Sequence, residues 1–375
     1  MASFDLVVVG AGIVGLAHAL AAARRGLHVV VLERDACANS ASVRNFGFVT
    51  VTGQDAGATR GRALRSREVW AEVAGEAGID IHQRGAVVVA QRPHALDVLR
   101  EFAAGPMGER CVLWDQGALR SRIPGIDAQA IGALWSPHEL RVEAREALPA
   151  LARWLEERHG VVFAWNTAAL GFDGTTVVHS SGKLASDALV ITPGAAVAAF
   201  APDLARRVKL RQCKLQMMRL ANPGFTLPGV VMSDLSLVRY GGFAMQPSAR
   251  PLESALEHDR KAALAAGVHL IVAQAGDGSI VVGDSHHYAE HADPFTSSAV
   301  DALILDEYRN LFGDPPEIVE RWAGYYPVAD GRPVLSEELA PRVRLVSVTS
   351  GTGMSTAFAI GEETLEQLFG AGTKG

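Results

Sequence analysis

The chain has 375 residues and a mass of 39.7 kDa, a length that suggests two domains or one large one. Hydrophobic residues make up 49% and charged residues 20%, which is ordinary for a folded protein with a sizeable core. A net charge of −6 argues against a nucleic-acid-binding surface and against binding to anionic membranes.

The cysteines and the apolar N-terminus bear on location. Cys37, Cys111 and Cys213 form neither a metal-binding spacing nor an even set of disulfide partners, so we expect a reducing cytoplasm and no metal site. The first twenty residues lack a basic start, and they include Asp5 and His18. We therefore expect neither a signal peptide nor a membrane span.

The N-terminus predicts a strand, a tight turn and a helix. Phe4–Val9 is the continuous apolar run of a parallel strand buried on both faces. Glycines 10, 12 and 15 form G-x-G-x-x-G, which lets the backbone approach a pyrophosphate at the start of the helix. We expect cofactor contacts here from Gly10, Gly12, Ile13, Val14 and Gly15.

A second strand, His28–Leu32, ends in a carboxylate. Glu33 follows the last motif glycine by 18 residues, where an acid accepts hydrogen bonds from ribose hydroxyls. This position disfavours the 2′-phosphate of NADP, although the neighbouring Arg34 weakens that argument. We include both residues among the cofactor-binding candidates.

Two later segments add to this nucleotide fold. The apolar strand Ala188–Thr192 ends in Pro193 and Gly194, and the C-terminal part of the chain predicts a strand, a Gly/Ser/Thr turn and a helix beginning near Ser355. A fold divided among the start, middle and end of the chain suits a long cofactor such as FAD, although NAD stays open at this point. The candidates in the last turn are Gly351, Thr352, Gly353, Met354 and Ser355.

Other segments predict a different sheet. Apolar residues alternate along 84–91, Arg211–Leu220 and 241–247, as they do in strands covered on one face. Residues 269–285 predict a hairpin around Asp277-Gly278. These are signals of an antiparallel sheet in a second domain.

Over nearly its whole length the chain resembles the FAD-dependent family that includes D-amino-acid oxidase, glycine oxidase and monomeric sarcosine oxidase. The resemblance rests on "VVVGAGIVGLAHALAAARRGLHVVVLER", "SASVRNFG", "ALVITPGA", "WAGYYPVADGRPVL" and "SGTGMSTAFAIGE", which occur in the family's order. Shorter matches such as "SVRNFGFVTVTGQ", "LRVEARE", "CKLQMMR" and "GDSHHY" resemble a bacterial branch linked to aminophosphonate catabolism.

The resemblance implies an α/β fold. A Rossmann-like FAD-binding domain with a parallel sheet (1–83, 140–208 and 318–375) would be interleaved with a substrate domain on a mixed, largely antiparallel sheet (84–139 and 209–317). Relatives of sarcosine oxidase attach FAD through a late cysteine, and this chain has none after Cys213, so we expect FAD to be held non-covalently.

Several residues are candidates for cofactor or substrate contact. Ser42, Arg44 and Asn45 lie in the loop that the family places along the pyrophosphate and flavin, and Trp322 opens a family segment. The remaining catalytic or substrate candidates are cations and rings: Lys214, Arg239, His286, His287 and Tyr326, with Arg44 shared. Each also has an ordinary interpretation, as a solvated strand end or a packing residue, and metal binding by His287 and His291 requires a helix that the pattern disfavours.

Tyr326 departs from the family pattern. In glycine-oxidase-like members an arginine before the proline binds the substrate carboxylate in a bidentate manner, and a phenol offers one hydrogen bond without charge. Either Tyr326 only packs, or the substrate anion is held elsewhere, by Arg44, Lys214 or Arg239.

The resemblance therefore implies an amine oxidase that oxidises a C–N bond of a small anionic amine, with O2 as acceptor. We expect an aminophosphonate, either 2-aminoethylphosphonate or an N-methyl or hydroxy derivative. The alternatives are an oxidase of glycine, sarcosine or another amino acid, a dehydrogenase with another acceptor, and a non-catalytic flavin- or NAD-binding protein.

Overall fold

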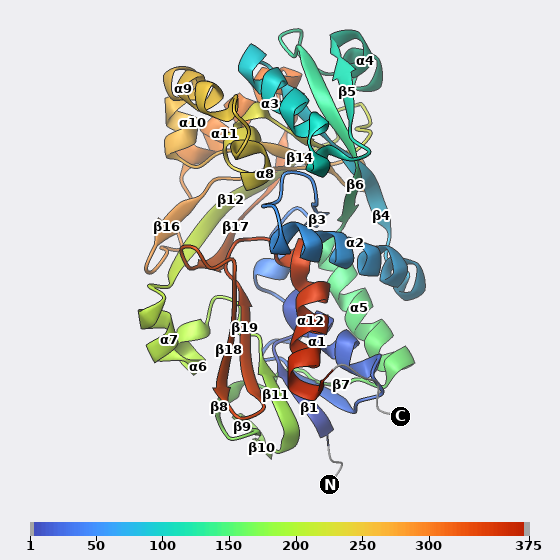
Figure 1. Cartoon of the computed structure of the whole chain (residues 1–375), viewed down its shortest axis with the longest axis vertical. Coiled ribbons are helices and arrows are strands. Elements are labelled where there is room, and N and C mark those ends of the chain that lie inside the picture. The colour runs from blue at the N-terminus through green and yellow to red at the C-terminus, as the bar shows by residue number, and fades with distance from the viewer. Residues whose placement is uncertain (1–3, 371–375) are drawn as a thin grey trace.

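Three distant parts of the chain build one six-stranded sheet in the computed structural model, which describes residues 4–370 (Figure 1). β1 pairs in parallel with β2 and β11, and its last four residues are buried, which confirms the predicted N-terminal strand. The strands, in sheet order, are β18 (Val334–Ala340), β19 (Val343–Val348), β11 (Ser186–Ile191), β1 (Phe4–Val9), β2 (Val29–Leu32) and β7 (Val162–Ala164).

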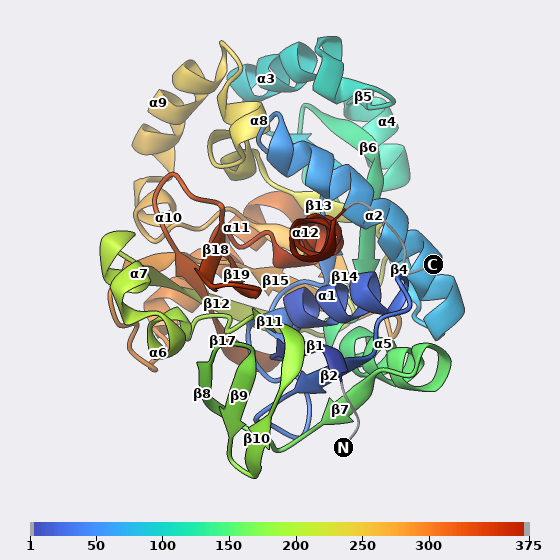
Figure 2. The same cartoon turned by 60° about the horizontal axis from the view of Figure 1, so that its bottom comes forward.

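Helices from both ends of the chain pack together beside this sheet. Figure 2 looks along α12 (Gly353–Phe369), which lies next to α1 (Ile13–Ala23). The crossing is close, because a Cβ added at Gly361 would lie 2.8 Å from the Ala17 carbonyl oxygen. The adjoining helices are α2 (Ala58–Ala77) and α5 (Ala144–His159). The Trp70 indole on α2 donates to the Met354 carbonyl at 2.8 Å.

A ten-stranded mixed sheet forms the second part of the molecule. All but one of its strand pairs are antiparallel, and β13 with β4 is the parallel pair. In sheet order the strands are β16 (His287–Ala289), β12 (Arg211–Leu220), β15 (Ile280–Gly283), β14 (Ile271–Gln274), β13 (Val230–Met232), β4 (Ile81–Ala90), β6 (Gly132–Val142) and β3 (Phe48–Val49). β17 (Ile318–Val328) also pairs with β12, and β5 (Val112–Asp115) with β6. The predicted α/β class, with one parallel and one largely antiparallel sheet, is confirmed.

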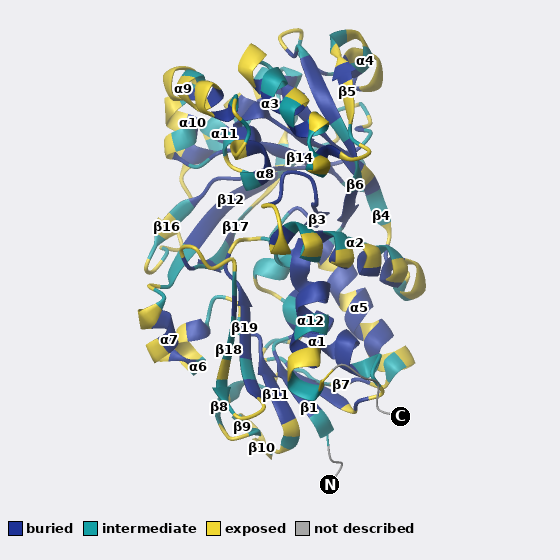
Figure 3. Ribbon diagram, viewed as in Figure 1, coloured by how far each residue is buried: buried dark blue, intermediate teal, exposed yellow. Residues whose placement is uncertain are grey.

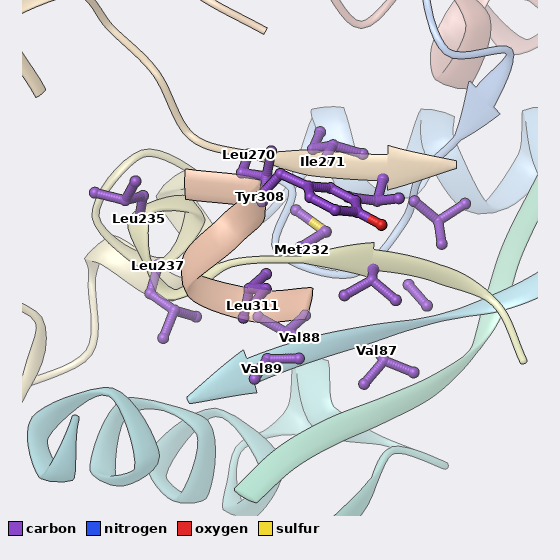
Figure 4. Close-up of a cluster of buried hydrophobic side chains, with 14 of the residues drawn as sticks. Val87, Val88, Val89, Met232, Leu235, Leu237, Leu270, Ile271, Tyr308 and Leu311 are labelled. Carbon is purple, nitrogen blue, oxygen red and sulfur yellow. The ribbon is translucent and has the colours of Figure 1, made fainter. Parts of the chain in front are cut away.

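A hydrophobic core fixes the large sheet to its helices. In Figure 4, Val87 to Val89 of β4, Met232 of β13 and Ile271 of β14 lie against Tyr308 and Leu311 of the helix α11. Burial in Figure 3 is continuous along the strands and interrupted on the outer helices. The helices of this part are α3 (Pro93–Ala104), α4 (Gln116–Arg122), α8 (Gly241–Ala244), α9 (Ala249–Asp259), α10 (Lys261–Ala265) and α11 (Ser298–Phe312).

Smaller elements complete the fold. A three-stranded sheet comprises β8 (Ala169–Asp173), β9 (Thr176–His179) and β10 (Gly182–Leu184), and two short helices, α6 (Val197–Phe200) and α7 (Pro202–Arg207), follow β11. Short 3-10 helices are η1 (Ala41–Val43), η2 (Pro106–Gly108) and η3 (Asp234–Val238). Within residues 4–370, no helix is both long and apolar enough to cross a bilayer.

One local prediction is wrong. Residues 241–247 contain the helix α8 instead of a strand, and this helix lies so close to Gln54 that a Cβ added at Gly242 would be 2.6 Å from the Gln54 carbonyl oxygen. Residues Trp322–Tyr326 lie inside the long strand β17, which continues to Val328. Pairing of β17 with β12 also joins it to the large sheet, whereas the predicted boundary at residue 318 assigns it to the FAD domain.

Candidate active site

A single cavity of about 1060 Å³ is lined by residues of both sheets. It begins at the G-x-G-x-x-G turn after β1 and continues past the start of α12 to side chains of the large sheet. Seventeen of the eighteen predicted cofactor residues line it, and Trp322 does not. Its volume is at the upper end of the roughly 300–1,000 Å³ of small-molecule and cofactor sites, so it has room for a long cofactor and a small substrate.

The glycine turn is shaped for close approach. Gly10 has φ of +101°, and a Cβ at Gly15 would lie 1.8 Å from the Gly10 carbonyl oxygen. The Ser42 hydroxyl accepts a hydrogen bond from Ile13 N–H at 3.0 Å, which brings the predicted loop to the first turn of α1. Gly12 provides no side-chain cap and the first turn of α1 has no acidic residue, so the partial positive charge of this helix N-terminus is directed at the cavity.

The carboxylate of Glu33 is fixed beside this turn. Its Oε2 accepts from Ala11 N–H at 2.8 Å, and its Oε1 accepts from Asp35 N–H at 3.1 Å. Arg34 also lines the cavity, and its guanidinium lies 3.6 Å from Asp35. Asn45 donates to the carbonyls of Ala41 and Ser42, and its amide oxygen accepts from Gly47 N–H, so its polar atoms hold the loop in shape.

A second helix begins at the same cavity. α12 starts at Gly353, two residues before the predicted Ser355, and like α1 it has neither a side-chain cap nor an acidic first turn. Ser355 accepts a hydrogen bond from Thr50 N–H at 2.9 Å, and Ser347 donates to the carbonyl of Gly194 at 3.1 Å. Two uncapped helix N-termini thus favour negative charge at two places along one cavity.

These features fit FAD. A dinucleotide needs backbone access at its pyrophosphate, an acceptor for its ribose hydroxyls and room for a ring system, and the turn, Glu33 and the space beside α12 provide these. Added Cβ atoms at Gly10 or Gly15 would fill the turn. The residues that would hold the cofactor are Gly10, Gly12, Ile13, Val14, Gly15, Glu33, Ser42, Gly351, Thr352, Gly353 and Met354.

Four of the six substrate candidates come together on the cavity wall: Arg44, Arg239, His286 and Tyr326. Lys214 is not among the lining residues, because its ammonium is bound by both Asp293 carboxylate oxygens at 2.9 Å and by the Phe295 carbonyl at 2.7 Å. His287 pairs with Lys214 across β16 and β12 and is likewise absent from the wall. The Arg145 guanidinium lies over the Trp322 ring, with its carbon 5.0 Å from the ring centroid.

Two arginines give the cavity positive charge. Among residues 4–370, neither Arg44 nor Arg239 has a carboxylate within ion-pair distance. Arg239 Nη2 donates to the Tyr288 phenol oxygen at 2.9 Å. Their charge is therefore available to an anionic ligand.

Tyr326 is a neutral residue of the wall. Burial, together with the adjacent Cys213 thiol, raises the pKa of its phenol far above the usual value. Burial also raises the pKa of Cys213 to about 11, so neither group ionises at physiological pH. The Tyr326 ring lies over Gly351, where an added Cβ would be 3.1 Å from the ring.

The sequence analysis missed His269 and Asp284, which lie beside His286. His269 Nε2 is 3.1 Å from Asp284 Oδ1, and His286 Nε2 is 3.8 Å from Asp284 Oδ2. Burial alone would raise the pKa of Asp284, but the nearby His286, His269 and Arg239 outweigh it and hold that pKa well below its usual range. Burial lowers the pKa of His286 to about 3, so its ring is neutral. The predicted hairpin could have indicated this cluster, because antiparallel pairing brings the residues before β14 next to the residues after β15.

Comparisons with known proteins agree with the fold. The family described as "FAD dependent oxidoreductase" (DAO) matches residues 5–367. An opine oxidase subunit of Rhizobium meliloti is 24% identical over 384 residues, covering 96% of this chain and 92% of that protein. Glycine oxidase of Bacillus cereus superposes with a TM-score of 0.78 at 17% identity, covering 99% of this chain and 96% of that one. Iminodiacetate oxidase of Chelativorans sp. BNC1 gives 0.73 at 18% identity, covering 99% and 96%.

Proposed function

The chain belongs to the DAO family of FAD-dependent oxidoreductases, which act on C–N bonds of amines or amino acids, and from this premise we propose that its substrate is a small aminophosphonate. The substrate would be 2-aminoethylphosphonate or an N-methyl or hydroxy derivative. Oxidation of its C–N bond gives an imine, which water hydrolyses to the aldehyde.

The chemistry is divided between cofactor and chain. When bound, FAD would supply the hydride acceptor for oxidation at the carbon that carries the nitrogen. The residues of the chain orient the amine and hold its anionic group, and neutral His286 and Tyr326 line the same end without adding charge.

The observation that carries the proposal is the pair of guanidinium groups. Arg44 and Arg239 line the cavity without ion-pair partners among the described residues, while the position of the family's carboxylate-binding arginine holds Tyr326. A phosphonate carries up to two negative charges on three oxygens, and it can accept hydrogen bonds from two separate guanidinium groups.

A glycine- or sarcosine-type oxidase is the second candidate. The fold shared with glycine oxidase favours it, and a guanidinium also binds a carboxylate. For either substrate we propose O2 as the acceptor and a cytoplasmic location, which three free thiols support. Peroxide formation in air distinguishes an oxidase from a dehydrogenase.

Anaerobic bleaching of the flavin tests the substrate. The purified holoenzyme is mixed with 2-aminoethylphosphonate, its N-methyl and hydroxy derivatives, glycine and sarcosine, and loss of flavin absorbance is followed. We expect at least one phosphonate to reduce the flavin faster than either amino acid at equal concentration. Reduction by glycine or sarcosine alone would assign the second function, and the aldehyde product is identified by trapping with a hydrazine.

A further inference from the structure

We propose that His269, Asp284 and His286 form a binding site for a divalent transition-metal ion at the substrate end of the cavity. One ligand-type atom from each residue lies within 4.8 Å of the other two. All three residues are buried, and all three line the cavity. They come from the two ends of the β14–β15 hairpin, so its strand pairing fixes their spacing.

The contacts within the cluster are incomplete without a cation. His269 Nε2 is 3.1 Å from Asp284 Oδ1, but the pair lacks hydrogen-bond geometry. Asp284 Oδ1 and His269 Nδ1 are both buried, and neither has a hydrogen-bond partner in residues 4–370. An unsatisfied buried carboxylate oxygen is costly, and a cation placed between the ligand atoms would satisfy it.

The tautomer of His286 leads to the same inference. Its Nδ1 lies 3.0 Å from the Gly267 carbonyl oxygen, and only a protonated nitrogen can donate to a carbonyl. In the neutral ring Nε2 therefore carries a lone pair, and it lies 3.8 Å from Asp284 Oδ2, a second acceptor. A cation placed between these two acceptors would be bound by both. A ring N–H donated to a backbone carbonyl is also the usual way in which a metal-binding histidine is oriented.

The donor set selects the kind of ion. Two imidazole nitrogens and one carboxylate oxygen suit Zn²⁺ and similar first-row ions, whereas Ca²⁺ and Mg²⁺ prefer oxygen donors alone. Three protein ligands leave a coordination position open, and the cavity lies on that side. The sequence analysis, which considered only the cysteines and the pair His287 and His291, predicted no metal site. His269 lies fifteen residues before Asp284, a separation that no short motif reveals.

The metal site also affects binding of the substrate's phosphonate group, an inference that rests on the proposed function. Arg239 contributes one positive charge near Asp284, and it opposes metal binding when no anion is present. Phosphonate oxygens that occupy the open position would relieve that repulsion. We therefore expect methylphosphonate, an unreactive probe, to tighten Zn²⁺ binding.

Metal titration of the holoenzyme tests the site. The flavoprotein is treated with chelator, dialysed, and titrated with Zn²⁺ by calorimetry and with Co²⁺ by its visible d–d absorption, with and without methylphosphonate. We expect one equivalent to bind, and we expect Asp284→Asn and His286→Gln to weaken binding at least about tenfold. His287→Gln is the matched control, because His287 is adjacent in sequence but not part of the cluster, and it should bind metal as the wild type does.

The outcomes separate this inference from the proposed function. Absence of stoichiometric binding with and without methylphosphonate, or binding that Asp284→Asn and His286→Gln leave intact, would overturn the metal site. Circular dichroism and flavin content establish that each variant is folded. Failure of every aminophosphonate to bleach the flavin would contradict the proposed substrate but would leave the metal result standing, because metal binding is read without turnover.

Discussion

The Arg239 guanidinium donates a hydrogen bond to the Tyr288 phenol at 2.9 Å and does not pair with a carboxylate among residues 4–370. Replacement by glutamine removes a charge-assisted contact to the substrate anion, which is worth about 1.5–3 kcal/mol. We expect Arg239→Gln to lower kcat/KM for the best amine about 10- to 100-fold, mainly through KM, and Arg239→Lys to lower it less.

The control for this prediction is Tyr288→Phe, which removes the hydrogen-bond partner of Arg239 but keeps its charge. Its kcat/KM should stay within a few-fold of the wild type in steady-state assays. An Arg239→Gln enzyme with wild-type KM would show that the anion is bound elsewhere, with Arg44 the remaining unpaired arginine on the wall.

Two substitutions at Tyr326 distinguish a role of the ring in packing from a role of the hydroxyl in substrate binding. The ring lies beside Gly351, where an added Cβ would be 3.1 Å from it, and the pKa of the phenol is too high for ionisation at physiological pH. We expect Tyr326→Phe to keep flavin content and kcat/KM close to wild type, because phenylalanine keeps the ring. Tyr326→Ala should lose on the order of 2 kcal/mol of stability and bind FAD more weakly. Urea denaturation and flavin release measure both, and a large loss of kcat in Tyr326→Phe would instead show that the hydroxyl contacts the substrate.

At the scale of elements, the crossing of α1 and α12 positions both helix N-termini at the cavity. A Cβ at Gly361 would lie 2.8 Å from the Ala17 carbonyl oxygen and 3.2 Å from His18 N. We expect Gly361→Ala to destabilise the protein by about 1–3 kcal/mol and to weaken FAD binding, because α12 must move away from α1.

Gly75→Ala is the matched control for this crossing. Gly75 lies inside α2, is exposed, and has no atom within 4 Å of an added Cβ. The substitution should stabilise the protein by about 0.5–1 kcal/mol and leave FAD affinity unchanged. Thermal unfolding and flavin titration check both variants. Equal effects of the two substitutions would mean that the crossing is looser than described.

The elements that the sequence predicts correctly are those with one strong local signal. β1 and β12 have the predicted bounds, and the hairpin at Asp277-Gly278 forms as expected, because apolar alternation and turn residues act over a few positions. The strand predicted at 241–247 fails because its alternation is equally consistent with one helical turn that buries Phe243 and exposes Met245. Trp322 lies off the cavity wall because its strand pairs with β12, a long-range contact that no local pattern shows.

The same distinction between local signals and long-range contacts applies to the site. The residues predicted to bind FAD have local sequence signatures, in glycine turns and helix starts, and all but Trp322 line the cavity. Lys214 illustrates the limit, since its partner Asp293 lies 79 residues away and no local pattern shows that its charge is neutralised. The proximity of His269 and Asp284 could not be predicted locally, because it results from the packing of a hairpin end against the cavity.

For the whole molecule, buried histidine sets a limit on stability in acid. His18 on α1 is fully buried, and burial lowers its pKa from 6.5 to about 4 against the opposing hydrogen bond to the Val14 carbonyl. Between these values the unfolded chain binds a proton that the folded chain does not, so stability is present above pH 6.5 and is lost as the pH falls. The loss approaches about 3 kcal/mol near pH 4.

Replacement of His18 isolates this contribution. The difference in unfolding free energy between wild type and His18→Leu should change by about 3 kcal/mol from pH 7 to pH 4, with the wild type losing more. Urea unfolding of both proteins at several pH values measures this difference in unfolding free energy. Subtracting one protein from the other cancels the effects of the remaining histidines, which both proteins contain. Parallel pH curves for the two proteins would exclude His18 as the cause.

The division of the FAD site between the two ends of the chain has a consequence for biosynthesis. Gly10 leaves the ribosome 343 residues before Gly353, where α12 begins. A nascent chain therefore exposes the apolar face of α1 until α12 has been made, and the pocket is complete only after α12 emerges. Flavin loading is thus a late event, and a chain truncated before α12 should be colourless and depend on chaperones for solubility.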